Sequence, residues 1–212
     1  FVRNSKDIED VHKIMDKSGR RIPVVAKIEK PQAVSNLEQI LQSFDAIMIA
    51  RGDLGVELPL EQVPLVQKNA IQLARQVGKP VIVATQMLES MISASRPTRA
   101  EASDVANAVL DGADALMLSG ETSVGENPVL VVETMAKIIE HVEEEALEQL
   151  PKLEIESKGS TGRALTTAAV AVGKAINAKY LIGFTETGRS VRLMARHRST
   201  TPILAFTTEQ SV

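Results

Sequence analysis

Four short apolar runs, rich in β-branched residues, alternate with longer helical patterns in the first part of the chain, and this alternation limits the fold more than any other feature. The runs predict strands at Val24–Glu29, Ala46–Ala50, Val81–Thr85 and Ala115–Ser119. The longer patterns predict helices at Ser5–Lys17, Ala33–Leu41, Leu60–Gln76, Arg99–Leu110 and Pro128–Ala146. Strands that alternate with helices form parallel sheets, and mostly apolar strands predict burial on both faces of the sheet.

Polar residues at the end of every predicted strand favour one of the two folds that such a sheet can adopt. These residues are Lys27 and Glu29, Arg51 and Asp53, Thr85 and Gln86, and Ser119 and Glu121. A doubly wound sheet gathers its chemistry at one switch point, whereas a barrel collects groups from the C-terminal ends of several strands. The polar residues follow four different strands, so the barrel is favoured. A closed barrel needs eight strands and typically about 250 residues, but only four such strands are predicted here. We therefore predict an α/β fold that contains half of a (β/α)8 TIM barrel.

A second, smaller α/β unit is expected after this half barrel. Pro151 and Gly159 lie in a linker-like stretch that predicts a boundary between 150 and 160, giving domains at 1–150 and 151–212. Elements are predicted at Thr161–Ile176 (helix), Tyr180–Phe184 (strand), Arg189–His197 (helix) and Ile203–Thr207 (strand). The chain starts with Phe1 rather than Met and stops just after a strand-like run, so we expect a fragment.

Composition excludes several classes of function. The 24 basic and 27 acidic residues give a net charge of −3 without long blocks of one sign, which argues against nucleic-acid and anionic-membrane surfaces. One Tyr, four Phe and no Trp leave few rings on which bases could stack. The absence of Cys rules out disulfides, thiolate zinc sites and a cysteine nucleophile, and favours a reducing, cytoplasmic setting. We find no uninterrupted apolar run of about 18 residues, which a membrane-spanning helix would need, and no basic-then-apolar leader pattern at the N-terminus.

The first two strand ends carry residue types that can serve a phosphorylated substrate. Lys27 and Glu29 share one face of their strand, where an ammonium can balance phosphoryl charge and a carboxylate can hold a hard cation. Arg51-Gly52-Asp53-Leu54-Gly55 follows the next strand, and its glycines would permit positive φ and close approach of an anion, with Asp53 as a second Mg²⁺ ligand. A structural ion pair and an ordinary tight turn remain the alternatives.

Three further places offer hydroxyl groups. The Thr85 hydroxyl could donate to a substrate carboxylate or serve only in packing or capping, and Ser119 could join a proton-carrying chain or simply end its strand. The loop at 185–190 precedes a predicted helix and could bind phosphate, or form a polar turn with a helix cap. Neither a P-loop nor a Gly-x-Gly-x-x-Gly fingerprint occurs, and the three His residues show no metal-ligand spacing.

An ordered set of strings resembles the pyruvate kinase family. The strings are Ala26-Lys27-Ile28-Glu29-Lys30-Pro31, Ile49-Ala50-Arg51-Gly52-Asp53-Leu54-Gly55, Ala84-Thr85-Gln86-Met87-Leu88-Glu89-Ser90-Met91, Arg96-Pro97-Thr98-Arg99-Ala100-Glu101, Asp104-Val105-Ala106-Asn107 and Met117-Leu118-Ser119-Gly120-Glu121-Thr122. The resemblance covers essentially the whole chain. It implies the C-terminal half of the catalytic barrel, followed by the start of the family's C-terminal regulatory domain.

The resemblance implies a glycolytic enzyme that moves the phosphoryl group of phosphoenolpyruvate to ADP, giving pyruvate and ATP. Mg²⁺ (or Mn²⁺) and usually K⁺ are its cofactors. By position, Lys27 looks like the lysine that stabilises the transferring group, while Glu29 and Asp53 look like the Mg²⁺ ligands. The N–H groups of Gly52 and Asp53 and the Thr85 hydroxyl would bind the substrate carboxylate. Ser119 falls in the region implicated in proton delivery to the enolate.

The same resemblance implies regulation and assembly. The residues Thr185, Thr187, Gly188, Arg189 and Ser190 resemble the phosphate-binding loop of a sugar-phosphate effector site. A homo-oligomer, a tetramer by resemblance, is expected. The K⁺ ligands, the lid domain and part of the nucleotide contacts would lie before Phe1, so the isolated chain is expected to be inactive.

Two other functions stay open at this point. The chain could be a non-catalytic assembly or effector-binding piece, because half a barrel exposes unpaired strand edges. It could also belong to another Mg²⁺-enolate barrel enzyme, such as a lyase of the phosphoenolpyruvate type, which would share the carboxylate pair but would not predict the loop at 185–190.

Overall fold

The structure is a computed structural model that describes residues 1–147, 150, 151, 153 and 160–210. It divides into two compact units, Phe1–Ala74 with Lys79–Pro151, and Arg75–Gly78 with Lys152–Val212. Most of the linker predicted between 150 and 160, including Gly159, lies outside the described residues.

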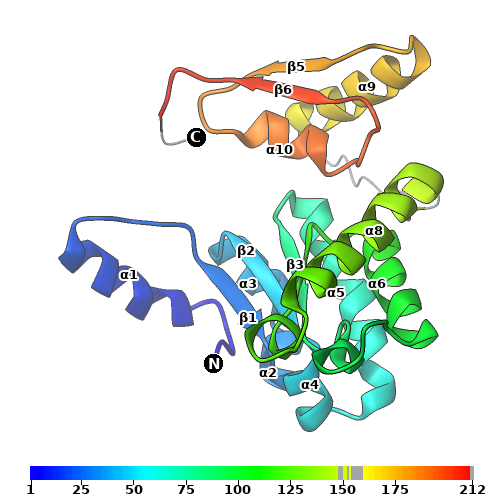
Figure 1. Cartoon of the computed structure of the whole chain (residues 1–212). Coiled ribbons are helices and arrows are strands. Elements are labelled where there is room, and N and C mark those ends of the chain that lie inside the picture. Colours follow the sequence, from blue (N-terminus) through cyan, green and yellow to red (C-terminus); the bar gives the residue numbers. More distant parts are fainter. Residues whose placement is uncertain (148–149, 152, 154–159, 211–212) are drawn as a thin grey trace. The chain divides into compact units, whose positions relative to one another are not determined.

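The first unit is built on a parallel sheet whose four strands follow the order β1-β2-β3-β4, and Figure 1 labels the first three of them. Each strand pairs with its neighbour in the sequence, as in a barrel, whereas a doubly wound sheet reverses its order at a switch point. The strands are β1 (Val25–Ile28), β2 (Ala46–Ala50), β3 (Val81–Ala84) and β4 (Ala115–Met117). The longer helices are α1 (Asp7–Ser18), α5 (Val63–Val77), α6 (Arg99–Asp111) and α8 (Pro128–Ala146). The shorter ones are α2 (Pro31–Ser35), α3 (Leu37–Ser43), α4 (Arg51–Glu57), η1 (Leu60–Gln62), η2 (Glu89–Ile92) and α7 (Gly120–Ser123).

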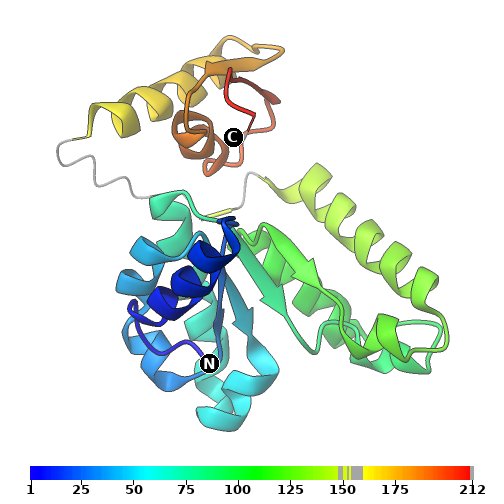
Figure 2. The ribbon, with the colours of Figure 1, turned by 90° about the vertical axis from the view of Figure 1, so that its left-hand side faces the viewer.

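One face of this sheet carries the core of the unit. Ile28, Ile49 and Val83 stand in register across three strands, and all three are fully buried. Helices α3, α5, α6 and α8 supply apolar side chains to the same core, and they lie beside the strands in Figures 1 and 2. Burial of this apolar surface is the main term that stabilises the unit.

The opposite face is more open, so the prediction of burial on both faces is wrong for β1, and it is also wrong for β4, which has no fully buried residue. Val25 and Lys27 are exposed on β1, while Ala26 and Ile28 are buried. In a closed barrel this face packs against side chains from the other strands. The described residues provide only four strands in this sheet, which leaves part of the face without such cover.

The strand ends contain more helix than the sequence predicted. Arg51-Gly52-Asp53-Leu54-Gly55 forms most of helix α4 instead of a tight turn, and neither glycine has positive φ. The predicted helix Ala33–Leu41 is divided at Asn36 into α2 and α3.

The second unit contains a two-stranded parallel sheet, β5 (Leu181–Phe184) with β6 (Ile203–Phe206), and helices α9 (Thr161–Ala175) and α10 (Arg189–Ala195). A Cβ atom at Gly173 would lie 2.6 Å from Leu181 Cδ2, so this glycine allows α9 to pack closely on β5. All four predicted elements of this unit are confirmed, with ends that differ by one or two residues. Within the described part of the chain, no helix is both long enough and apolar enough to span a membrane.

Candidate functional site

Three charged groups from two neighbouring strand ends meet at one point of the first unit. The Lys27 ammonium on β1 lies 2.5 Å from Glu29 Oε2 and 2.8 Å from Asp53 Oδ2. Glu29 follows β1, and Asp53 lies in the first turn of α4, directly after β2. Parallel pairing of β1 with β2 puts both strand ends at the same edge of the sheet. The structure thus brings together the three residues that the sequence assigned to phosphoryl and metal binding.

The surroundings of the two carboxylates differ. The Glu29 side chain is 5% exposed, whereas the Asp53 side chain is 52% exposed and the Lys27 side chain 48% exposed. Hydrogen bonds to Asp53 and then to Glu29 raise the pKa of Lys27 above its usual value, despite some opposing desolvation. Lys27 is therefore a stable cation at a site that remains open to a charged ligand on the Asp53 side.

Thr85 stands beside the same helix end. The Gly52 N–H donates a hydrogen bond of 2.8 Å to the Thr85 hydroxyl, which itself donates to Ala84 O at 2.6 Å. A Cβ atom at position 52 would lie 3.3 Å from the hydroxyl oxygen, so Gly52 serves the close approach of Thr85. The Gly52 N–H predicted to bind an anion is paired with the Thr85 hydroxyl here.

Ser119 follows β4, the strand next to β3, and is held by a buried carboxylate. Its N–H donates a hydrogen bond of 2.7 Å to Glu121 Oε2, while Glu121 Oε1 accepts from the Leu88 N–H at 3.2 Å. Glu121 is 1% exposed. This side chain fastens the segments after β3 and β4 to each other and so fixes the backbone at Ser119.

The donor set at Lys27 suits a hard divalent cation. Glu29 and Asp53 each present a carboxylate oxygen to the Lys27 ammonium, so two anionic oxygens lie close together here, and such oxygens are the ligands that a hard cation prefers. No group of three or more His, Cys, Asp or Glu side chains suitable for a metal occurs among the described residues. A metal held by this pair would thus need substrate oxygens or water for its remaining ligands.

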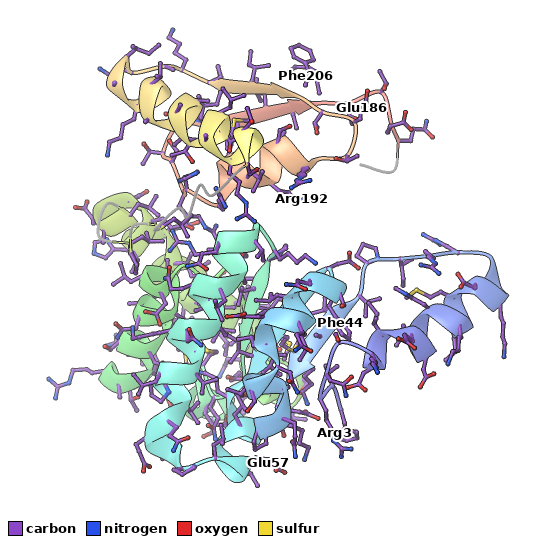
Figure 3. The ribbon with its side chains drawn as sticks, turned by 180° about the vertical axis from the view of Figure 1, so that it is seen from behind. Arg3, Phe44, Glu57, Glu186, Arg192 and Phe206 are labelled. Carbon is purple, nitrogen blue, oxygen red and sulfur yellow. The ribbon has the colours of Figure 1, made fainter. Side chains whose placement is uncertain are left out.

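A cavity of about 1000 Å³ lies in the second unit, beside the other predicted site. Thr185, Thr187, Arg189 and Ser190 line it, and Gly188 has a φ of 72° at the start of α10. Phe206 forms part of the wall and stacks on Phe184 with 5.6 Å between ring centres. Figure 3 labels Glu186, Phe206 and Arg192 on the segments around this cavity. The loop thus borders a space large enough for a small phosphorylated ligand.

Sequence reasoning missed two features near the first site. Lys30 and Glu57 form an ion pair of 2.6 Å that links the start of α2 to the end of α4, where Figure 3 labels Glu57. Arg51, noticed only as a strand-end residue, binds the backbone carbonyls of Thr85 and Gln86 and the carboxylate of Asp104. The position of Arg51 directly after a strand was the available signal, but its partners depend on the three-dimensional fold.

Comparisons with known proteins identify the family of the chain. A family model described as "Pyruvate kinase, barrel domain" matches residues 1–132, and one described as "Pyruvate kinase, alpha/beta domain" matches residues 163–212. A pyruvate kinase of Mycobacterium tuberculosis is 60% identical over 207 residues, which are 98% of this chain and 43% of that protein. A pyruvate kinase of Corynebacterium efficiens is 57% identical over 212 residues, covering 100% of this chain and 44% of that protein.

A solved structure supports the fold. The crystal structure of a pyruvate kinase from Cryptosporidium parvum superposes with a TM-score of 0.87 at 39% identity, and the match covers 99% of this chain and 44% of that one. The chain therefore spans less than half the length of the relatives that it matches. The first unit is part of a TIM barrel, the second is part of an α/β domain, and the chain belongs to the pyruvate kinase family.

Proposed function

We propose that this chain supplies catalytic groups for phosphoryl transfer from phosphoenolpyruvate to ADP, giving pyruvate and ATP. The observation that carries the proposal is the meeting of the Lys27 ammonium with the Glu29 and Asp53 carboxylates at the C-terminal edge of a parallel sheet. In this reaction the bond between the enol oxygen and phosphorus breaks, and a bond from phosphorus to a terminal ADP oxygen forms. Such a site must hold negative charge on the transferring group and on the enolate that it leaves behind.

Each charged group has a proposed role. The Lys27 ammonium stabilises charge on the transferring phosphoryl group, and its 2.8 Å contact with Asp53 keeps it next to the metal position. Glu29 and Asp53 would hold Mg²⁺, or Mn²⁺ in its place, which supplies positive charge for the phosphoryl and enolate oxygens. The buried Glu29 gives this arrangement a fixed point, since its side chain has little room to move.

The neutral groups are proposed to orient the substrate. The N–H groups of Gly52 and Asp53 and the hydroxyl of Thr85 bind the carboxylate of phosphoenolpyruvate, which replaces the present contact between Gly52 and Thr85. Ser119 takes part in delivering a proton to the enolate carbon, with its backbone fixed by Glu121. The enolate then becomes pyruvate.

The proposal extends to regulation and assembly. Residues Thr185, Thr187, Gly188, Arg189 and Ser190 would bind the phosphate of a sugar-phosphate effector at the cavity of the second unit. The domains are proposed at 1–150 and 151–212, in a homotetramer. The K⁺ ligands and part of the ADP contacts would come from residues other than these 212.

Replacement of Lys27 tests the proposed function. In a full-length protein that contains these residues, Lys27→Met should lower the rate of ATP formation from phosphoenolpyruvate and ADP by at least about 100-fold, because one preorganised charged donor is commonly worth that much. Lys13→Met is the matched control, since Lys13 also pairs with an aspartate, Asp10, but lies exposed on α1. Near-normal turnover in Lys27→Met would refute the proposal.

A further inference from the structure

Arg51 joins the helix after β2 to the segment after β3. It is the first residue of α4, and its side chain is 11% exposed. Its Nη2 atom lies 2.9 Å from Thr85 O and 3.0 Å from Gln86 O. Both carbonyls belong to the segment that carries the Thr85 hydroxyl toward Gly52.

The backbone that Arg51 binds has an uncommon conformation. Thr85 has a φ of 70° and Gln86 a φ of 54°, and neither is a glycine. Positive φ is uncommon outside glycine and is a particular outlier for a β-branched residue such as Thr. Two such residues in succession persist only where the surroundings hold them. The hydrogen bonds from Arg51 to both of their carbonyls are contacts of the required kind.

Arg51 is itself held in place by Asp104 on α6. The two terminal guanidinium nitrogens of Arg51 each lie 2.7 Å from a different oxygen of Asp104. Paired contacts of this kind fix the plane of the guanidinium as well as its position. Arg51 Nη2 also lies 2.9 Å from the sulfur of Met87, which is fully buried.

We propose that Arg51 is a positioning residue for substrate binding, which acts through Thr85 and is itself oriented by Asp104. Its Nη2 atom binds the carbonyls of Thr85 and Gln86 and so holds both residues at positive φ, and this conformation turns the Thr85 hydroxyl toward the Gly52 N–H. A lysine at position 51 keeps the charge, but it has no second nitrogen to bind Asp104 Oδ1 while the first faces the carbonyls, so its ammonium is not held in one orientation. The role in binding rests on the proposed function, because it assumes that the Thr85 hydroxyl binds the carboxylate of phosphoenolpyruvate.

The first test separates positioning from general stabilisation. In a full-length protein that contains these residues, Arg51→Lys should raise the KM for phosphoenolpyruvate by roughly 10-fold or more, which corresponds to the loss of one hydrogen bond to a charged group. The KM for ADP should stay unchanged. Asp104→Asn should raise the KM for phosphoenolpyruvate in the same direction. Arg21→Lys serves as the control, since Arg21 makes a similar paired contact with Asp16 on the exposed side of α1.

A double-mutant cycle shows whether Arg51 acts through Thr85. Thr85→Val removes the hydroxyl, so Arg51→Lys should add little to the KM for phosphoenolpyruvate in that background, because residues that act as a unit are not additive. Multiplicative effects of the two substitutions overturn the proposal. Equal changes in both KM values, or a loss of thermal stability with unchanged KM values, also overturn it.

A crystal structure of the Arg51→Lys variant tests the positioning role of Arg51 without any measurement of activity, and so separately from the proposed function. If the unsubstituted protein forms no ATP from phosphoenolpyruvate and ADP, the proposed function fails, and the role of Arg51 is judged on geometry alone. We expect Thr85 or Gln86 to leave the positive-φ region in the variant and the contact between Gly52 N and Thr85 Oγ1 to lengthen. Retention of both φ values and of that contact would disprove the positioning role.

Discussion

At the scale of single residues, Asp53 gives the most direct test of the proposed metal site, since it is the more exposed of the two carboxylates at Lys27. Asp53→Asn keeps the shape of the side chain but removes the negative charge that a hard cation prefers. We expect the Mg²⁺ concentration for half-maximal ATP formation to rise by at least roughly 10-fold, because loss of even an outer-shell partner often weakens metal binding that much. Titration of a full-length protein with Mg²⁺ measures this value.

The control for Asp53 is Asp10, whose carboxylate pairs with Lys13 on the exposed surface of α1. Asp10→Asn should leave the Mg²⁺ requirement unchanged. The same half-maximal Mg²⁺ concentration in Asp53→Asn and in the unsubstituted protein would contradict the assignment of Asp53 as a ligand.

The sequence could bring Lys27, Glu29 and Asp53 together because one general rule connects them. Parallel strands end at one edge of the sheet, so polar residues just after two adjacent strands are neighbours whatever the details of the loops. The same rule places Arg51 after its strand but does not predict which groups its side chain binds. Its partners depend on the positive φ of Thr85 and on the placement of Asp104, and both are set by packing of the finished fold.

At the scale of elements, prediction was best where a local signal marks the start of a helix. Helix α8 has the predicted bounds, Pro128–Ala146, since Asn127-Pro128 is a strong entry signal. Helix α4 was missed because its two glycines lower helix propensity. Burial of Leu54, which is fully enclosed in the core, outweighs that propensity, and burial of this kind is a tertiary effect that local patterns do not contain.

Glu101 links two elements, and its replacement should make stability depend less on pH. Its carboxylate accepts hydrogen bonds from Ser90 and Thr98, which connect η2 to the start of α6. Burial alone would raise the pKa of Glu101, but these hydrogen bonds together lower it below 4.5. A lowered pKa in the folded state stabilises the protein above pH 4.5, and this contribution is lost as the pH falls through the folded value.

Glu101→Gln should therefore lower the free energy of unfolding by roughly 1 to 2 kcal/mol at neutral pH, as loss of a capping interaction does. The difference between variant and unsubstituted protein should shrink below pH 4.5, the value for an unperturbed Glu. Urea unfolding at neutral and acidic pH measures both quantities. Glu9→Gln in the first turn of α1 is the control, and an equal pH dependence in the two variants would speak against the role of Glu101.

At the scale of the whole molecule, β1 and β4 are the edge strands of the four-stranded sheet. Among the described residues, no further strand pairs with the outer side of either one. A closed barrel has no such edges, because its first and last strands pair. Unpaired edges invite pairing with other chains. The face that carries Lys27 is also partly open, whereas strands from the remainder of a barrel would cover it.

We expect the isolated 212-residue chain to form no measurable ATP from phosphoenolpyruvate and ADP, although it carries Lys27, Glu29 and Asp53. These three charged groups can contact a transferring phosphoryl group from one side only. Catalysis of this reaction depends on groups that surround the phosphoryl group and hold both substrates in line. Size-exclusion chromatography should show self-association through the edges β1 and β4. A monomeric chain that turns over at the rate of a full-length protein would show that these strands and their loops already contain the complete catalytic site.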